Sequence, residues 1–137
     1  MFEYLGKRKV LLVYVPLIAY WLVLFIATTL PAERLPSLGF TDKVSHLIAY
    51  FILAVLVYLT LIYQRKFRLL FEKAPIATVI ICLFYGAVDE LHQLLVPGRS
   101  AETMDWVADA LGTSLGVLVI YFLITKLKYR LEFNEVR

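Results

Sequence analysis

The chain has 137 residues, of which 61% are hydrophobic and 18% charged, and its net charge is +3. Average soluble domains hold roughly 45–50% apolar and about 25% charged residues, and a small soluble domain has too much surface to hide so much apolar material. The composition therefore excludes a disordered chain, and the single cysteine, Cys82, excludes a disulfide-stabilised fold. An integral membrane protein is the class that remains.

Four segments are long and apolar enough to cross a bilayer, which requires about 20 mostly apolar residues. In chain order they cover about residues 10–30, 44–63, 74–96 and 103–124. Pro16 lies inside the first segment and predicts a kink there. The first apolar run is longer than the roughly 7–15-residue core of a signal peptide, so we expect a retained anchor. We predict an all-α polytopic membrane protein with four transmembrane helices in a single domain, residues 1–137.

Basic residues gather on one side of these predicted helices. Eleven of the 14 Lys and Arg residues lie in the N-terminal segment, in the loop between the second and third helices, and in the C-terminal segment. The positive-inside rule then places both termini and this loop in the cytoplasm. Membrane orientation and contact with anionic lipids thus explain the positive charge, and no nucleic-acid partner is needed.

Ionisable and polar side chains gather at the opposite, outer end of the predicted helices. The second helix begins with Asp42, Lys43, His46 and Tyr50, the third ends with Asp89, Glu90, His92 and Gln93, the fourth begins with Asp105 and Asp109, and Arg99 lies in the loop before it. At a helical rise of about 1.5 Å per residue, these groups share the outer half of the bilayer. Charged groups inside a bilayer are costly and by default mark function. We therefore predict one outward-facing polar site.

Spacing within the fourth helix indicates where its acids point. Residues three or four apart share a helix face, so Asp105 and Asp109 continue the stripe formed by Gly112 and Gly116. Small residues on such a stripe let another membrane helix approach closely. We therefore expect both carboxylates to point into the helix bundle.

Four short motifs cover the second to the fourth predicted helix. They are Asp42-Lys43-x-x-His46-x-x-x-Tyr50, Tyr85-Gly86-x-x-Asp89-Glu90-x-His92-Gln93, Pro97-Gly98-Arg99-Ser100 and Asp105-x-x-x-Asp109-x-x-Gly112. Together they resemble the VanZ-like family, which often has Asn at the position of Asp109. The resemblance implies a small multi-pass protein of the bacterial cytoplasmic (inner) membrane and cell envelope, with a role in antibiotic resistance through glycopeptide (teicoplanin) susceptibility.

The polar site permits catalysis or binding, and the sequence does not decide whether the protein is an enzyme. Candidates for proton transfer are Asp89, Glu90 and His92, because burial disfavours an ionised carboxyl group and a nearby cation opposes that. Candidates for binding are Asp42, Lys43, His46, Tyr50, Gln93, Arg99, Asp105 and Asp109, with Lys43 and Arg99 suited to a phosphate. The expected substrate or ligand is a cell-wall precursor or a lipid-linked phosphate.

Two further interpretations stay open. Asp, Glu and His can ligate Mg²⁺, Mn²⁺ or Zn²⁺, but no closely spaced metal motif is present, so metal and cofactor are left undecided. Alternatively, the buried polar residues form a structural interhelical network in a non-catalytic membrane binding or scaffold protein. Polar contacts between membrane helices contribute about 0.6 kcal/mol on average, which is a modest gain for so many groups.

Overall fold

The computed structural model describes residues 10–31, 42–64 and 66–135, with side chains described as far as residue 127. In chain order its elements are η1 (Val10–Tyr14), α2 (Val15–Thr29), α3 (Asp42–Tyr63), α4 (Arg68–Glu72), α5 (Ala74–Gln93) and α6 (Thr103–Glu135). No strand occurs among these residues, and the predicted all-α class is confirmed. Six of the basic residues counted for the orientation lie outside the described residues, namely Lys7, Arg8, Lys9, Arg34, Arg65 and Arg137.

Four helical stretches of the described chain are long and apolar enough to cross a membrane, as predicted. They are Val10–Thr29, Asp42–Tyr63, Ala74–Gln93 and Thr103–Leu127. Large apolar side chains such as Leu22, Ile80 and Phe84 lie more than half exposed on the outside of the bundle. Such a surface suits lipid rather than water, so the protein is a multi-pass membrane protein in contact with lipid.

At Pro16, where the sequence predicts a kink, the structure has a change of helix type. η1 is a single π-helical turn, and α2 begins at Val15 with Pro16 in its first turn. Proline has no backbone N–H to donate and its ring crowds the carbonyl four residues earlier. A wider π-helical turn before the proline relieves that crowding, so the span continues across it.

The contact between α3 and α6 is the most extensive in the bundle. Gly112 and Gly116 make it possible: a Cβ atom at Gly112 would collide with the backbone carbonyl of Leu47, and one at Gly116 would lie 2.6 Å from the carbonyl oxygen of Phe51. The close helix approach predicted from the small-residue stripe is therefore confirmed. The two backbones touch where side chains normally separate helices.

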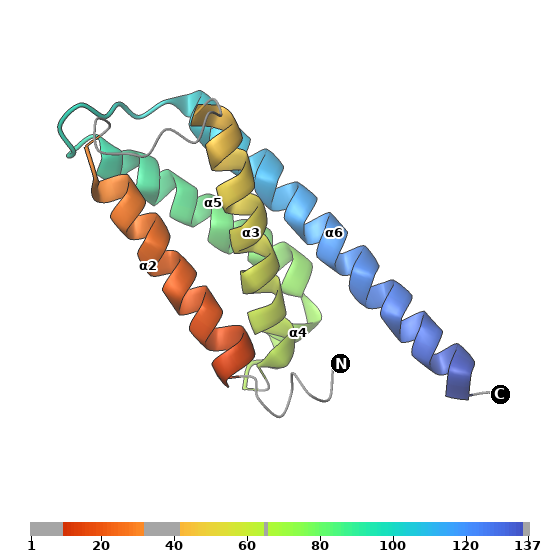
Figure 1. Cartoon of the computed structure of the whole chain (residues 1–137). Helices are drawn as coiled ribbons and strands as arrows, with labels where there is room; N and C mark the ends of the chain where they lie inside the picture. Colours follow the sequence, from red (N-terminus) through yellow and green to blue (C-terminus); the bar gives the residue numbers. More distant parts are fainter. Residues whose placement is uncertain (1–9, 32–41, 65, 136–137) are drawn as a thin grey trace.

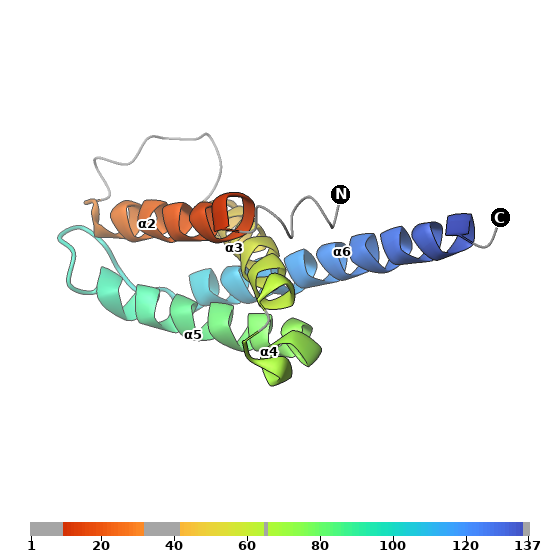
Figure 2. The same cartoon turned by 90° about the horizontal axis from the view of Figure 1, so that it is seen from below.

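Four helix ends lie together at one end of the bundle (Figure 1). Figure 1 shows the start of α3, the end of α5 and the start of α6 at the same end, beside the end of α2. The opposite end carries α4 and the link between α3 and α5. An apolar core that includes Leu53, Ala54, Val57 and Cys82 lies within the bundle. Seen along the other direction in Figure 2, α6 continues well past the rest of the bundle.

Replacing Gly112 with valine should push α3 and α6 apart. Overpacking of this kind costs about 1–3 kcal/mol, so the unfolding free energy in detergent should fall by that amount. Ser114→Val is the matched control, because Ser114 is exposed on the same helix two residues away. Equal losses from both variants would show that the helix contact does not depend on the missing side chain.

Candidate functional site

A contact between His46 and Asp109 lies at the centre of the polar end. His46 Nδ1 lies 2.9 Å from Asp109 Oδ1, so α3 and α6 are joined by a polar contact beside the glycine contact. The Asp109 side chain is fully buried, with 0% of its surface exposed. A carboxylate in so dry a place requires a partner, and an imidazole that donates or carries a positive charge provides one.

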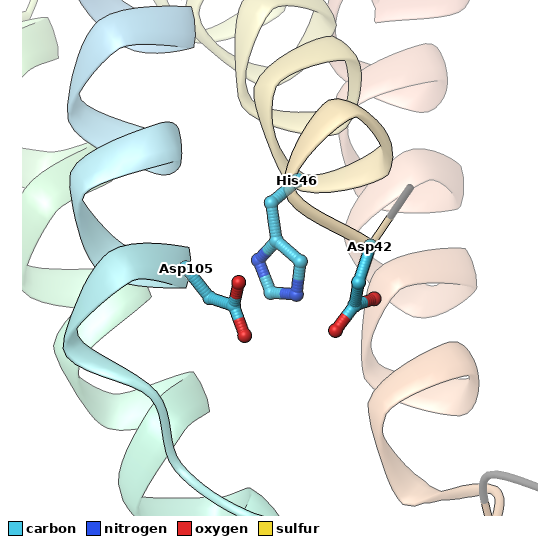
Figure 3. A group of neighbouring side chains, drawn as sticks. All are labelled: Asp42, His46 and Asp105. Atoms are coloured by element: carbon cyan, nitrogen blue, oxygen red, sulfur yellow. The ribbon is translucent and has the colours of Figure 1, made fainter. Parts of the chain in front are cut away.

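An outer group of side chains opens toward the end of the bundle. Figure 3 shows the His46 ring between the carboxylates of Asp42 and Asp105. Each of these three residues offers a ligand atom within 4.8 Å of the other two. Asp105 is buried, whereas Asp42 is exposed. The outer group therefore extends from the buried Asp105 to the exposed Asp42 at the protein surface.

Lys43 is paired within the protein. Its Nζ donates to Glu102 Oε2 at 2.6 Å and to Asp105 Oδ1 at 3.0 Å, which ties the start of α3 to the start of α6. Glu102 is not among the residues that the sequence predicted for the site. The sequence feature that could have indicated Glu102 is its position directly before a predicted helix, where the helix dipole favours an acid. The expected phosphate-binding ammonium group thus already holds two carboxylates.

An inner group adds Glu90 of α5 to the central pair. Atoms of His46, Glu90 and Asp109 lie within 4.8 Å of one another. Glu90 Oε2 accepts a hydrogen bond from the backbone N–H of Glu102 at 2.9 Å. Two other carboxylate oxygens, Glu90 Oε1 and Asp109 Oδ2, are buried with no hydrogen-bond partner among the described residues, and the same holds for the Tyr50 hydroxyl.

Gly86 explains how α5 comes close enough to this inner group. A Cβ atom at Gly86 would lie 3.0 Å from Asp109 Oδ2 and 3.4 Å from the Tyr50 ring. Any side chain there would therefore press on the one Asp109 oxygen that the His46 ring does not contact. The glycine therefore leaves space beside Asp109 Oδ2 inside the bundle.

Two further predicted residues, His92 and Arg99, contact α2. His92 Nε2 lies 3.2 Å from Thr29 Oγ1, and its ring packs against Phe25 with 5.5 Å between ring centroids. Arg99 donates to the carbonyl oxygens of Ala27 at 2.9 Å and Leu30 at 3.2 Å. A basic side chain on these last carbonyls caps the helix and complements its dipole.

Asp89 and Glu90 are adjacent on α5, but their side chains contact different parts of the bundle. Asp89 is buried and lies within hydrogen-bonding reach of Thr28 on α2. Gln93 is buried as well, and its Nε2 has no hydrogen-bond partner within the described part of the chain. The structure therefore brings Asp42, Lys43, His46, Tyr50, Glu90, Asp105 and Asp109 together, while His92 and Arg99 contact α2.

A mostly apolar groove of about 350 Å³ opens beside the inner group, between α5 and α6. Its walls include Ala87, Leu91 and Trp106, and its polar lining comes from Glu90, Glu102 and Thr103. Trp106 is held by a hydrogen bond from Nε1 to the Leu83 carbonyl at 3.1 Å. Leu91 is 65% exposed, so the groove reaches the lipid-facing surface. No motif in the sequence indicated this groove, because its lining depends on how α5 and α6 are rotated.

Fold and site together define a multi-pass membrane protein with a polar cluster at one end of its helix bundle. Residues 8–125 match the VanZ/LLP1 family, and the chain belongs to this family. It is also similar to an uncharacterized protein of Schizosaccharomyces pombe, with 30% identity over 114 residues that cover 82% of this chain and 63% of the relative. The chain thus spans less than two thirds of that relative's length. No solved structure matches the chain.

Removing the Arg99 side chain should loosen α2 from the polar end. Arg99→Ala deletes two charged hydrogen bonds to helix-end carbonyls, which should cost about 1–3 kcal/mol of unfolding free energy in detergent. Arg68→Ala is the control, because Arg68 makes an exposed ion pair with Glu72 within α4 and should matter little. A loss from Arg68→Ala as large as that from Arg99→Ala would contradict this assignment.

Proposed function

We propose that this VanZ/LLP1 protein binds a lipid-linked phosphate at the polar end of its bundle, on the outer side of the membrane. One observation carries the proposal: Glu90 lines the lipid-facing groove and also belongs to the inner group with His46 and Asp109. The Glu90 side chain therefore belongs both to the mostly apolar groove and to the polar inner group. That arrangement fits a ligand with an apolar chain and a charged head.

The groove supports a lipid rather than a water-soluble ligand. Its walls at Ala87, Leu91 and Trp106 are apolar and reach the surface that lipid covers. Ligand sites are typically apolar with a few polar groups that fix orientation, and here those polar groups lie at Glu90 and Glu102. A chain lying in the groove would place its head group beside the start of α6.

The charges around the head-group position restrict how a phosphate is held. The nearby acids repel an anion, and Lys43 already contacts Glu102 and Asp105. Lys43 is about half exposed, so it can exchange one carboxylate for a phosphate oxygen. Arg99 donates to carbonyl oxygens of α2 instead, so its role is to hold that helix and not to bind the ligand.

If the ligand is also modified, Glu90 is the proton-transfer residue that the geometry favours. It is buried and lines the groove, whereas the His92 ring packs against Phe25 of α2. Asp89 lies beside Thr28 and away from the groove lining. Glu90 is therefore the group that can reach a substrate atom in the groove.

The S. pombe relative bears on which ligand the family would share. In a bacterial cytoplasmic membrane the ligand would be a carrier of cell-wall precursors, and an effect on teicoplanin susceptibility would follow from competition for it. A relative in S. pombe favours the lipid phosphate itself as the common ligand, since fungi build no peptidoglycan. We therefore place the phosphate, rather than the wall precursor attached to it, at the centre of the proposal.

A structural network is the second candidate function for the polar end. The bridge from Lys43 to Glu102 and Asp105, and the contacts from Arg99 to α2, join helix ends and engage both cations of the polar end within the protein. In that case the groove would bind ordinary lipid without preference for its head group. Ligand binding separates the two candidates.

Filling the groove should weaken the binding of a polyprenyl phosphate. Ala87→Phe places an aromatic ring in the groove from an exposed position, so binding to the protein in nanodiscs should weaken by about tenfold, or 1.4 kcal/mol. Ala19→Phe is the matched control, because Ala19 is an exposed alanine of α2. Equal binding of polyprenyl phosphate and the uncharged polyprenol by the unaltered protein would favour the structural network.

The proposed orientation predicts which loop faces the exterior. In a Cys82→Ala background, Ser100→Cys should react with a membrane-impermeant maleimide in intact cells, because Ser100 is exposed at the polar end. Lys66→Cys, exposed at the opposite end, should react only after the membrane is opened. The reverse pattern would place the polar site in the cytoplasm.

A further inference from the structure

We infer that His46, Glu90 and Asp109 form a binding site for a divalent metal ion of the Zn²⁺ or Mn²⁺ type. The role of this metal rests on the lipid-phosphate function proposed above, because the ion would supply the positive charge that holds the phosphate. Metal binding itself is measured without any lipid. The two can therefore fail separately.

Three different helices supply the ligand atoms. His46 comes from α3, Glu90 from α5 and Asp109 from α6, and their ligand atoms lie within 4.8 Å of one another. Ligands around Zn²⁺ lie about 2.0–2.2 Å from the metal, so small side-chain rotations suffice to bring three such atoms onto one ion. The glycine contact between α3 and α6 holds two of the three ligands at a fixed separation.

Two carboxylate oxygens point independently to a ligand. Glu90 Oε1 and Asp109 Oδ2 are buried and have no hydrogen-bond partner among the described residues. Their side chains are 7% and 0% exposed. A buried carboxylate oxygen without a partner costs free energy, and a cation between the two carboxylates removes that cost.

The charge and chemistry of the set select the metal class. Two carboxylates and a neutral imidazole carry a charge of −2, which a divalent cation balances. Imidazole suits Zn²⁺ and related transition metals, and carboxylates suit Mg²⁺, Ca²⁺ and Mn²⁺. A mixed set therefore favours Zn²⁺ or Mn²⁺ over Mg²⁺. Three protein ligands also leave a position for an oxygen of water or phosphate, as in metal sites that act on a substrate.

The outer group of Asp42, His46 and Asp105 is the weaker metal site. Asp105 already accepts a hydrogen bond from Lys43, and that ammonium group would repel a cation. Asp42 is exposed, so its carboxylate does not need a partner within the protein. Because both groups share His46, only variants of the acids distinguish them.

The test measures metal bound to purified, chelator-treated protein in detergent. Zn²⁺ and Mn²⁺ are added separately, and bound metal is counted by mass spectrometry while metal-induced thermal stabilisation gives the affinity. Glu90→Gln and Asp109→Asn each remove a proposed ligand. Asp89→Asn is the matched control, a buried acid next to Glu90 that lies outside the set. Asp42→Asn tests the outer group.

We expect about one ion bound per chain, with binding weakened by at least about 100-fold in Glu90→Gln and Asp109→Asn, because loss of a mere outer-shell partner already costs roughly 10–100-fold. Asp89→Asn and Asp42→Asn should bind like the unaltered protein. Loss of binding in Asp42→Asn but not in Glu90→Gln would overturn the assignment. So would the absence of any bound metal in the unaltered protein.

A second measurement does not depend on the folding of the variants. Co²⁺ added to the unaltered protein should give the visible absorption of a site with a nitrogen ligand and low coordination number, and Zn²⁺ should abolish it by competition. A Co²⁺ spectrum identical to that of the hydrated ion would overturn the inference. Polyprenyl phosphate binding that persists after the metal is stripped would leave the lipid function intact and remove only its link to the metal.

Discussion

The backbone contact between α3 and α6 is the constraint on which the rest of the polar end depends. Gly112 lets α6 press on the carbonyl of Leu47, and one turn away this places Asp109 against His46. A larger residue at Gly112 would push the two helices apart and take His46 away from the fully buried Asp109 carboxylate. The apolar packing of the glycine stripe thus holds the charged pair together, and Gly86 does the same for α5.

Hydropathy and helix period were sufficient to predict the four spans, their all-α class and the end at which the polar residues gather. They also predicted the buried carboxylates of Asp105 and Asp109, because the glycines mark the inner face of that helix. The rotation of α5 could not be predicted in this way. Asp89, Glu90 and His92 lie within one turn, yet Glu90 faces the inner group and His92 faces α2. Sequence spacing relates residues on one helix and does not say which neighbour each face meets.

Contacts from the link between α5 and α6 were beyond sequence reasoning for a different reason. Glu102 donates its backbone N–H to Glu90 and accepts from Lys43, and Arg99 reaches back to the end of α2. Such contacts depend on where a short irregular segment passes over the bundle, which no periodic pattern records. Because of these contacts, Lys43 and Arg99, which the sequence predicted to bind a phosphate, join helices instead. The inner group then consists of two acids and one histidine.

The pairing of α3 with α6 has a consequence for how the protein is made. α3 enters the membrane well before α6 leaves the ribosome, because α4 and α5 lie between them in the chain. During that interval His46 and Lys43 have none of their α6-side partners, and the face that Gly112 will cover is open to lipid or to the insertion machinery. Biogenesis therefore passes through a state in which a polar helix face is unpaired in the membrane. Assembly is completed only when α6 has been synthesised and docks against α3.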